Sequence, residues 1–410
     1  MITGKTRYGL QYAVKRSGSA AAYCALSIKC GTRDEDGFHN GIAHFTEHTV
    51  FKGTNRKKAR VINEYIDKLG GELNAFTTKE EIVIHTVTLK EDLYKAASLA
   101  LELATCPTFP EDEINIEKGV VIDEINSYKD TPSEDIYDKF EEMFFDGHPL
   151  GKPILGTVAS VKKITPEELH RFVGEKFIAP NMVLSMVADI DEKAMEKRIL
   201  ALADKFFVNE NHERQVCTEE FVCPEPKQFD KSVNKRNHQT NCVIGALAPS
   251  LYSEKERIAT VLLCNILGGP ASNSILNSVL REKNGWVYNV ECSYNQYSDC
   301  GIVVIGLGCD RENLDKCLHF IDKELFKLQT EPLSEYKLKK AKRQLLGQIA
   351  ISSEQGETEC LSMGKSMMAF GKVRSEEELK SRIEAVTASE LQNLAQKIFS
   401  TDKLSKLIYY

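Results

Sequence analysis

The segment Gly41-Ile-Ala-His-Phe-Thr-Glu-His-Thr-Val-Phe51 contains the pattern His-x-x-Glu-His. On a helix, His44 and His48 are four residues apart, so their imidazoles point in nearly the same direction, one turn apart. This spacing allows two nitrogen atoms to bind one Zn²⁺ ion. Glu47 shares that face and can hold a water molecule and take its proton without being a ligand. Pairs of histidines at this spacing also occur without a metal, and the glutamate is what favours a metal site.

A second charged segment offers a third ligand, because a catalytic zinc ion usually has three protein ligands and one open position. Glu113, Glu117 and Glu124 are separated by four and seven residues, so they share one face of a predicted helix. The apolar run 120–122 places Glu124 in surroundings that suggest a carboxylate inside the protein. Ordinary surface charge is the alternative, since helices often carry glutamates. A His-x-x-Glu-His pattern is the arrangement of the inverzincin peptidases.

The order of predicted elements in the first half mixes hairpin-like strands with runs of helices. Such a mixture favours an α+β fold over a strict alternation of strand and helix. The predicted strands are 8–14, 20–30, 72–77, 81–89 and 181–190, and the predicted helices are 39–51, 59–69, several between 91 and 175, and 191–205.

The second half repeats this order, which predicts a duplicated domain. Its predicted strands are 241–248, 287–295 and 301–308, and its predicted helices are 253–267, 273–284, 310–328 and 332–354. A length of 410 residues also exceeds what one core usually supports. We therefore predict two similar domains, 1–206 and 238–410, each a mainly antiparallel sheet with helices packed on it. The polar stretch 207–237, with Pro224 and Pro226, is predicted to link them.

Bulk properties narrow the class of protein. The net charge of −7 gives no reason to expect nucleic acid or an anionic membrane as a partner. No apolar run approaches the roughly 18 residues of a membrane span, and the N-terminus does not resemble a signal peptide. The 12 cysteines form no Cys-x-x-Cys pair. Reduced, mostly buried thiols in a cytoplasmic protein are the expectation.

The metal motif and the distal glutamates resemble those of the pitrilysin family of zinc metallopeptidases, in particular the branch that includes the mitochondrial processing peptidase and its bacterial homologues. Glu124 follows His48 by 124 − 48 = 76 positions, a separation typical of that family. The resemblance implies that His44, His48 and Glu124 are the metal ligands. It further implies that Glu47 is the catalytic base and that Glu117 is a second catalytic glutamate that supports the site.

The resemblance extends to a short strand, Asn74-Ala-Phe-Thr77, which is similar to the family's edge strand that pairs with the substrate backbone. It implies that Asn74, Ala75 and Phe76 bind substrate. His85 lies in the next predicted strand. Because the alternation places it on one face with two valines, we expect it to line the core or a cleft and not to bind metal.

The second half contains Leu280-Arg-Glu-Lys-Asn-Gly-Trp-Val-Tyr288, which resembles the family's Arg…Tyr segment. The resemblance implies that Arg281 and Tyr288 bind substrate. Arg281 can offer a fork of donors to a carbonyl oxygen, and Tyr288 can donate to a developing oxyanion. The ordinary alternative is an exposed arginine and a half-buried tyrosine without such a role.

Together these features predict a zinc-dependent endopeptidase that hydrolyses peptides or small unfolded proteins enclosed between two domains. Relatives typically enclose the cleft with four domains, so a homodimer is expected, with a heterodimer as the alternative and the Arg…Tyr pair acting in cis or in trans. The rival hypothesis is a non-catalytic or heterodimer-dependent scaffold or processing subunit of the same family. Such a relative would be expected to have lost a ligand or the base, and here all five positions are present.

Overall fold

A computed structural model describes residues 1–208 and 222–410, which form two compact units. The first unit contains residues 1–126, 152–208 and 351–374 of the described chain. The second unit contains residues 127–151, 222–350 and 375–410. Neither unit is a single continuous stretch of sequence.

The first unit is built on a six-stranded sheet with the order β1-β2-β6-β3-β5-β4, so β4 lies at one edge. Only β2 and β6 pair in parallel, and every other neighbouring pair is antiparallel. This arrangement agrees with the predicted mainly antiparallel sheet, and β1 is a strand that the sequence analysis did not predict. The strands are β1 (Ile2–Lys5), β2 (Gln11–Arg16), β3 (Ala21–Ile28), β4 (Glu72–Thr77), β5 (Ile82–Leu89) and β6 (Met182–Ala188).

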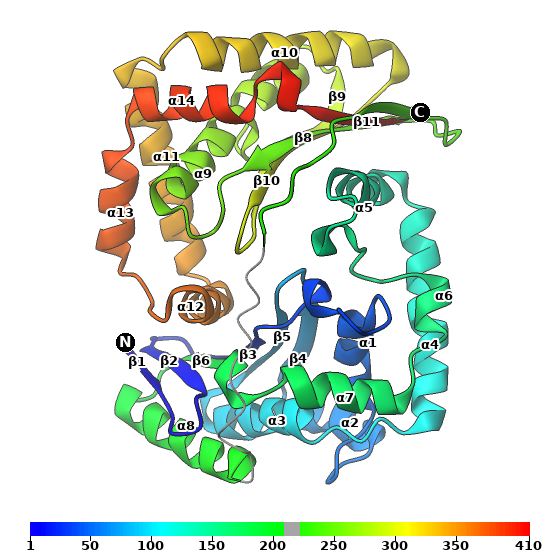
Figure 1. Ribbon diagram of the computed structural model, residues 1–410. Coiled ribbons are helices and arrows are strands. Elements are labelled where there is room, and N and C mark those ends of the chain that lie inside the picture. Colours follow the sequence, from blue (N-terminus) through cyan, green and yellow to red (C-terminus); the bar gives the residue numbers. More distant parts are fainter. Residues whose placement is uncertain (209–221) are drawn as a thin grey trace. The chain divides into compact units, whose positions relative to one another are not determined.

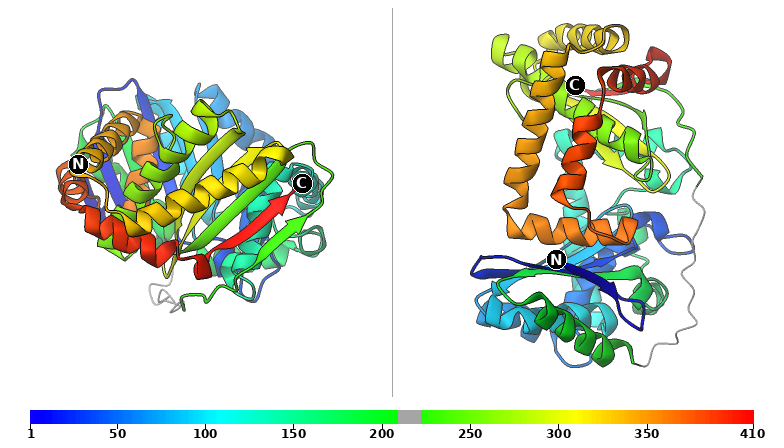
Figure 2. Two further views of the ribbon diagram at one scale, coloured as in Figure 1. Left: turned by 90° about the horizontal axis from the view of Figure 1, so that it is seen from above. Right: turned by 90° about the vertical axis from the view of Figure 1, so that its left-hand side faces the viewer.

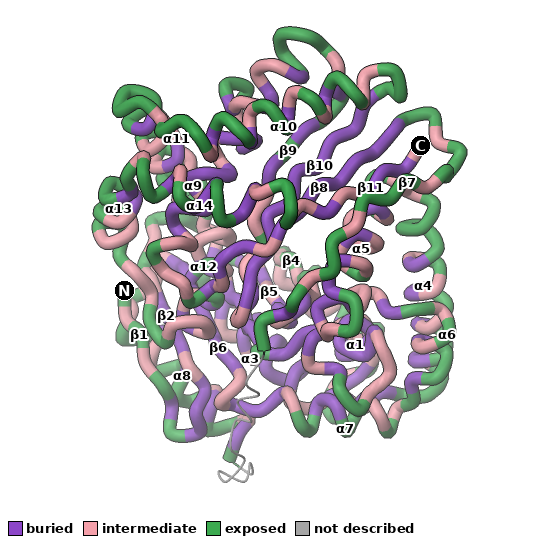
Figure 3. The backbone as a smooth tube through the Cα atoms, turned by 45° about the horizontal axis from the view of Figure 1, so that its top comes forward, coloured by how far each residue is buried: buried purple, intermediate pink, exposed green. Residues whose placement is uncertain are grey.

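Helices α3 and α8 cover one face of this sheet (Figure 1). Their apolar residues belong to the same hydrophobic core as those of β2, β3 and β5. The central strand β6 is buried along its whole length (Figure 3). The helices that this part of the chain contributes are α1 (Ile42–Thr49), α2 (Ala59–Lys68), α3 (Leu93–Thr105), α4 (Glu111–Lys129), α6 (Val158–Val161), α7 (Pro166–Lys176) and α8 (Glu192–Phe207).

The opposite face of the sheet is covered by α12 (Gly356–Phe370), which comes from the other half of the sequence (Figure 2). Small residues allow the helix to lie close to the strands. A Cβ atom at Gly364 would stand 2.8 Å from the Oγ atom of Ser27, and one at Gly356 would meet the ring of Tyr23. The sheet that carries the metal motif is therefore completed by a distant segment.

The second unit is built on a five-stranded sheet with the order β7-β11-β8-β10-β9, in which only β7 and β11 are parallel. Of the predicted linker 207–237, residues 209–221 lie outside the described residues. Residues 230–233 of that linker form the edge strand β7, which corrects the prediction, because a short polar strand at a sheet edge looks like a loop in sequence. The strands are β7 (Asp230–Val233), β8 (Thr240–Ala248), β9 (Val287–Gln296), β10 (Gly301–Cys309) and β11 (Ser405–Tyr409).

One face of the second sheet packs against α9 and α14, and the other against α5 (Pro132–Phe144), a helix from the first half of the sequence. Phe140 of α5 lies so close to the sheet that a Cβ atom at Gly245 would stand 2.7 Å from its ring. The compact units thus differ from the contiguous ranges 1–206 and 238–410, because α5 and α12 each pack with the other half. The remaining helices are α9 (Glu254–Gly268), α10 (Leu314–Thr330), α11 (Glu335–Ser353), α13 (Glu376–Ala385) and α14 (Ala388–Ile398).

None of the helices in the described residues is long and apolar enough to span a membrane. The described cysteines are free thiols, and all except Cys106 and Cys223 are buried. This agrees with the expectation of reduced, mostly buried thiols.

Candidate metal centre

Helix α1 and helix α4 bring the predicted ligands together within the first unit. The Nε2 atom of His44 lies 3.7 Å from the Oε2 atom of Glu124, and the Nε2 atom of His48 lies 3.5 Å from the same oxygen. One ligand atom from each residue falls within 4.8 Å of the others, and no second group of this kind is found in residues 1–208 and 222–410. Of the three glutamates on that face of α4, Glu124 is the one that lies near the Nε2 atoms of both histidines.

These distances are close to those in a zinc site, with 3.5 Å inside the range expected and 3.7 Å just above it. Zinc binds nitrogen and oxygen at about 2.0–2.2 Å, which places the ligand atoms of a tetrahedral site roughly 3.3–3.6 Å apart. The Oε2 atom of Glu124 is also buried and has no hydrogen-bond partner among the described residues. An unpaired buried carboxylate oxygen is costly, and a cation bound between the three side chains would satisfy it.

The two histidines have different electrostatic surroundings. Burial, and then the proximity of His48, lower the pKa of His44 to about 3, so this imidazole is neutral at pH 7 and has a lone pair available. Burial also opposes the charged form of His48, but the neighbouring carboxylates, Glu117 foremost, outweigh burial and raise its pKa. The carboxylates that raise the pKa of His48 are Glu117, Glu47 and Glu124, and their negative charge would also favour a bound cation.

Glu47 lies beside the ligands without joining them. The hydroxyl of Thr77 donates a hydrogen bond of 2.8 Å to its Oε2 atom. Burial raises the pKa of Glu47, against the opposing effects of Thr77 and His48. A raised pKa brings a carboxylate closer to the range in which it exchanges protons at neutral pH. The position and surroundings of Glu47 suit the predicted role of a base.

Glu117 supports one of the two histidines. Its Oε1 atom lies 2.8 Å from the Nδ1 atom of His48, and its Oε2 atom lies 2.5 Å from the Nζ atom of Lys52. Burial opposes ionisation, yet the hydrogen bonds from His48 and Lys52 hold the pKa of Glu117 below its usual value. The Nδ1 atom of His44, in contrast, is buried without a hydrogen-bond partner in the described chain. The supporting carboxylate thus acts on His48 alone.

The sequence analysis missed Lys52 and a buried acid, Glu35. Lys52 follows His48 by four residues, a spacing that could have placed it on the same face. The carboxylate of Glu35 accepts hydrogen bonds from the backbone N–H groups of Gly41 and Ala43, and so caps the first turn of α1. Burial raises the pKa of Glu35 to about 8. Glu35 lies four residues before the predicted helix 39–51, not immediately before it where a capping residue is recognised in sequence.

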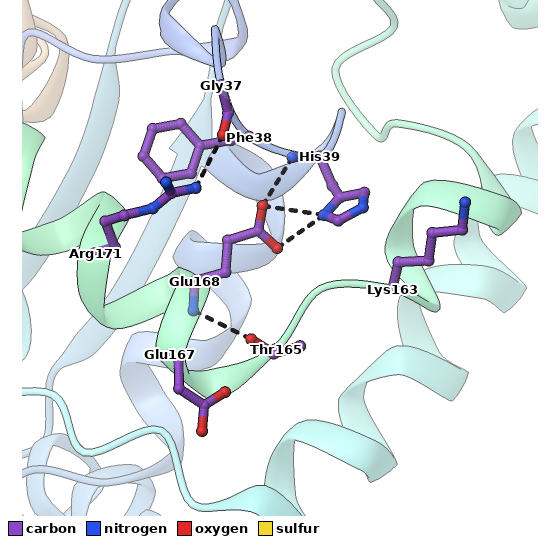
Figure 4. Close-up of a pocket in the computed structure, with 8 residues that line it drawn as sticks. All are labelled: Gly37, Phe38, His39, Lys163, Thr165, Glu167, Glu168 and Arg171. Atoms are coloured by element: carbon purple, nitrogen blue, oxygen red, sulfur yellow. Dashed lines mark hydrogen bonds and ion pairs between the residues drawn. The ribbon is translucent and has the colours of Figure 1, made fainter.

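A pocket of 580 Å³ lies between the loop that precedes α1 and the start of α7 (Figure 4). Glu168 accepts a hydrogen bond from the backbone N–H of His39 at 2.9 Å, and its Oε2 atom lies 2.9 Å from the His39 Nδ1 atom. Arg171 donates to the carbonyl of Gly37 and lies over the ring of Phe38. None of the predicted ligands lines this pocket. The contacts of Glu168 and Arg171 instead hold the segment that leads into α1.

The predicted substrate strand lies where the sequence placed it, at an edge of the sheet. Asn74, Ala75 and Phe76 belong to β4, whose one strand neighbour among the described residues is β5. Asn74 pairs with His85, whose Nδ1 atom lies 2.9 Å from Glu357 and which does not join the metal group. The edge position of the strand is confirmed, and its binding of substrate stays a prediction.

The predicted Arg…Tyr pair belongs to the second unit. Arg281 is exposed in the π-helix η6 (Asn277–Lys283). That helix ends at Lys283, and Gly285 follows with a φ of 60° that suits glycine and an N–H that donates to the carbonyl of Arg281. Tyr288 is 52% exposed, and its hydroxyl donates to Asp310 at 2.8 Å. Both side chains are accessible, and their action on substrate stays a prediction.

Comparison with known proteins places this geometry in a family. Residues 12–158 match the family described as Insulinase (Peptidase family M16), and residues 163–345 match the Peptidase M16 inactive domain. An uncharacterized zinc protease of Rickettsia felis is 30% identical over 93% of this chain and 91% of its own length. The chain belongs to the M16 peptidase family.

Other M16 relatives agree with this assignment. An uncharacterized zinc protease of Bacillus subtilis is 29% identical over 93% of this chain and 91% of its own length. A crystal structure of a peptidase M16 inactive domain from Pseudomonas fluorescens has the same fold, with a TM-score of 0.87 and 21% identity over 100% of this chain and 97% of that one. His44, His48 and Glu124 all lie within residues 12–158, the part that matches the Insulinase (Peptidase family M16) description, and outside residues 163–345.

Proposed function

We propose that this M16 chain is a zinc-dependent endopeptidase with His44, His48 and Glu124 as ligands and Glu47 as general base. The observation that carries the proposal is the convergence of two imidazole nitrogens and one carboxylate oxygen that has no hydrogen bond among the described residues, beside the partly buried carboxylate of Glu47. The names of the relatives, which are called zinc proteases, support it.

Each residue of the centre has a distinct chemical task. A bound Zn²⁺ would supply Lewis acidity toward a peptide carbonyl and lower the pKa of a water molecule. Glu47 takes the proton of the attacking water and later passes it to the leaving amine. Glu117 accepts a hydrogen bond from the Nδ1 atom of His48, which leaves the Nε2 atom free to face Glu124. The chain thus holds the nitrogen lone pair and the base in position before substrate arrives.

The substrate class follows from the edge strand. An extended peptide can pair its backbone with the open edge of β4, beside Asn74, Ala75 and Phe76. Only extended chains can pair in this way, so peptides and small unfolded proteins are the proposed substrates. Arg281 and Tyr288 are proposed to hold the substrate backbone and the oxyanion, from the same subunit or the other one of a homodimer in the cytoplasm.

The alternative is a non-catalytic subunit, or one that cleaves only with a different partner chain. A subunit without catalytic function has no need to keep both the ligands and the base. The presence of Glu47 next to three intact ligand positions therefore favours the enzyme. Activity of the purified chain alone separates a self-sufficient enzyme from one that depends on a heterodimer.

The test combines metal content with peptide cleavage. Wild-type protein is expected to contain one zinc per chain and to cleave members of a mixed peptide library. A variant with both His44→Ala and His48→Ala should lose the metal, whereas His85→Ala, a matched change of a histidine outside the centre, should keep it. Glu47→Gln should retain zinc and lose turnover by at least about 10²-fold. Full zinc content in the double variant, or wild-type turnover in Glu47→Gln, would refute the assignment.

A further inference from the structure

The residue that contacts the proposed base lies on the proposed substrate strand. Thr77 is the last residue of β4, and α1 packs against this strand. Side chains alternate along a strand, so Thr77 points to the same face as Leu73 and Ala75, which pack against the core on the α1 side. From there its hydroxyl donates a hydrogen bond of 2.8 Å to the Oε2 atom of Glu47.

This contact restrains a side chain that otherwise has several rotatable bonds. Thr77 donates a side-chain hydrogen bond to the Glu47 carboxylate and so links it to β4. A glutamate loses rotamer freedom only when another group holds it, and a base displaced by about 1 Å loses much of its rate advantage. The Thr77 hydroxyl therefore provides the positional restraint that a general base requires.

Thr77 can provide this restraint because its own backbone is held firmly. It pairs with Ile82 of β5, and the turn that follows is closed by the N–H of Thr78 donating to Glu81 and by two N–H groups donating to the Thr78 hydroxyl. A site built on a paired strand is more precise than one built on a free loop. The other edge of the same strand is the one that an extended peptide would join.

We propose that Thr77 is a positioning residue that fixes the carboxylate of Glu47 relative to the strand that receives the substrate. The inference rests on the proposed function, because it assigns Thr77 to the same reaction. The position of β4 then determines both where the substrate backbone lies and where the Glu47 carboxylate points. Any shift of β4 moves the two together, so their mutual geometry is preserved.

The experiment compares Thr77→Val, which keeps the shape and removes the donor, with Thr77→Ser, which keeps the donor. Thr88→Val is the matched control, because Thr88 is buried in the neighbouring strand and its hydroxyl has no hydrogen-bond partner among the described residues. The readouts are kcat and KM on a quenched-fluorescence peptide, zinc content, melting temperature, and a crystal structure of each variant.

Thr77→Val is expected to lower kcat by about 10-fold to 100-fold, the scale of a hydrogen bond to a charged group, with KM and zinc content little changed. Thr77→Ser should recover most of that loss, and Thr88→Val should behave as wild type. In the crystal structure of Thr77→Val, the Glu47 carboxylate should leave its position or occupy several. These results would support the inference.

Other results would overturn it. Unchanged kcat in Thr77→Val, or an equal loss in Thr88→Val, would show that the hydroxyl does not position the base. A fall in zinc content together with kcat would assign Thr77 to metal retention. If wild-type protein binds zinc and cleaves nothing, the proposed function fails. In that case, a Glu47 carboxylate that keeps its position in the structure of Thr77→Val would overturn the inference that Thr77 positions it.

Discussion

Replacement of Glu117 by glutamine tests how the centre holds His48. The carboxylate of Glu117 serves two donors at once, the Nδ1–H of His48 at 2.8 Å and the ammonium group of Lys52 at 2.5 Å. Glutamine has the same shape but a single acceptor oxygen, with a donor group in the other position. The variant can therefore satisfy one of these partners and must present an N–H₂ group to the other.

Either orientation weakens the site. If the amide oxygen turns to Lys52, the amide nitrogen faces the Nδ1 atom of His48 and favours the tautomer that carries its proton on Nε2. That nitrogen faces Glu124 at 3.5 Å and could then bind no metal. If the oxygen stays on His48, the amide N–H₂ group faces the Lys52 cation. Loss of such a supporting partner typically costs 10-fold to 100-fold in metal affinity, or about 1.4–2.7 kcal/mol.

The assay is a competition between the protein and a fluorescent zinc chelator of known affinity. Glu117→Gln is expected to raise the zinc dissociation constant by about 10-fold to 100-fold. Glu113→Gln is the matched control, because Glu113 lies one turn earlier on the same helix and is not part of the metal group. A dissociation constant equal to that of wild type would refute the reasoning. An equal shift in Glu113→Gln would assign the effect to net charge.

Three further predictions follow from single contacts. Lys52→Met leaves the buried carboxylate of Glu117 without its cation, so zinc affinity should fall by about 10-fold. Lys52→Arg should keep the zinc affinity of wild type, and competition with a chelator measures both. Equal affinity in Lys52→Met would contradict this. Tyr288→Phe should lower kcat/KM by about 10²-fold if its hydroxyl, which donates to Asp310 at 2.8 Å before substrate binds, moves to the oxyanion. Unchanged peptide kinetics would exclude that role. Burial raises the pKa of Glu35 to about 8 in the folded protein, against roughly 4.3 in the unfolded chain, so the folded state holds the extra proton between these values. The free energy of unfolding should therefore fall more steeply with rising pH in wild type than in Glu35→Gln between about pH 5 and about pH 9. Urea unfolding at several pH values measures it, and the same pH dependence in both proteins would contradict the prediction.

Local periodicity was sufficient to predict the elements that carry the centre. The spacing of His44 and His48 requires a helix if both are to face one ion, and α1 covers both residues. The alternation of 81–89 and the short run 72–77 predicted the two paired strands β5 and β4. The repeat of strand and helix order between the halves predicted two sheets of similar build. Each of these signals is carried by neighbours in sequence.

Only the tertiary structure decided which faces meet. Periodicity places Glu113, Glu117 and Glu124 on one face of α4. Only the tertiary structure shows that Glu124 lies near the Nε2 atom of His48 and that Glu117, 69 residues away in sequence, contacts its Nδ1 atom. The spacing of four residues could place Lys52 on the face of His48, but nothing in the sequence shows that Lys52 contacts Glu117. The sequence analysis likewise did not predict that α5 and α12 each pack against the sheet of the other half. An amphipathic sequence shows that a helix has an apolar face, but not which sheet covers that face. A sequence pattern specifies the face that a side chain occupies within its own element. The partner of that face is chosen by packing over the whole chain, because the apolar surface of one element is chemically equivalent to that of many others.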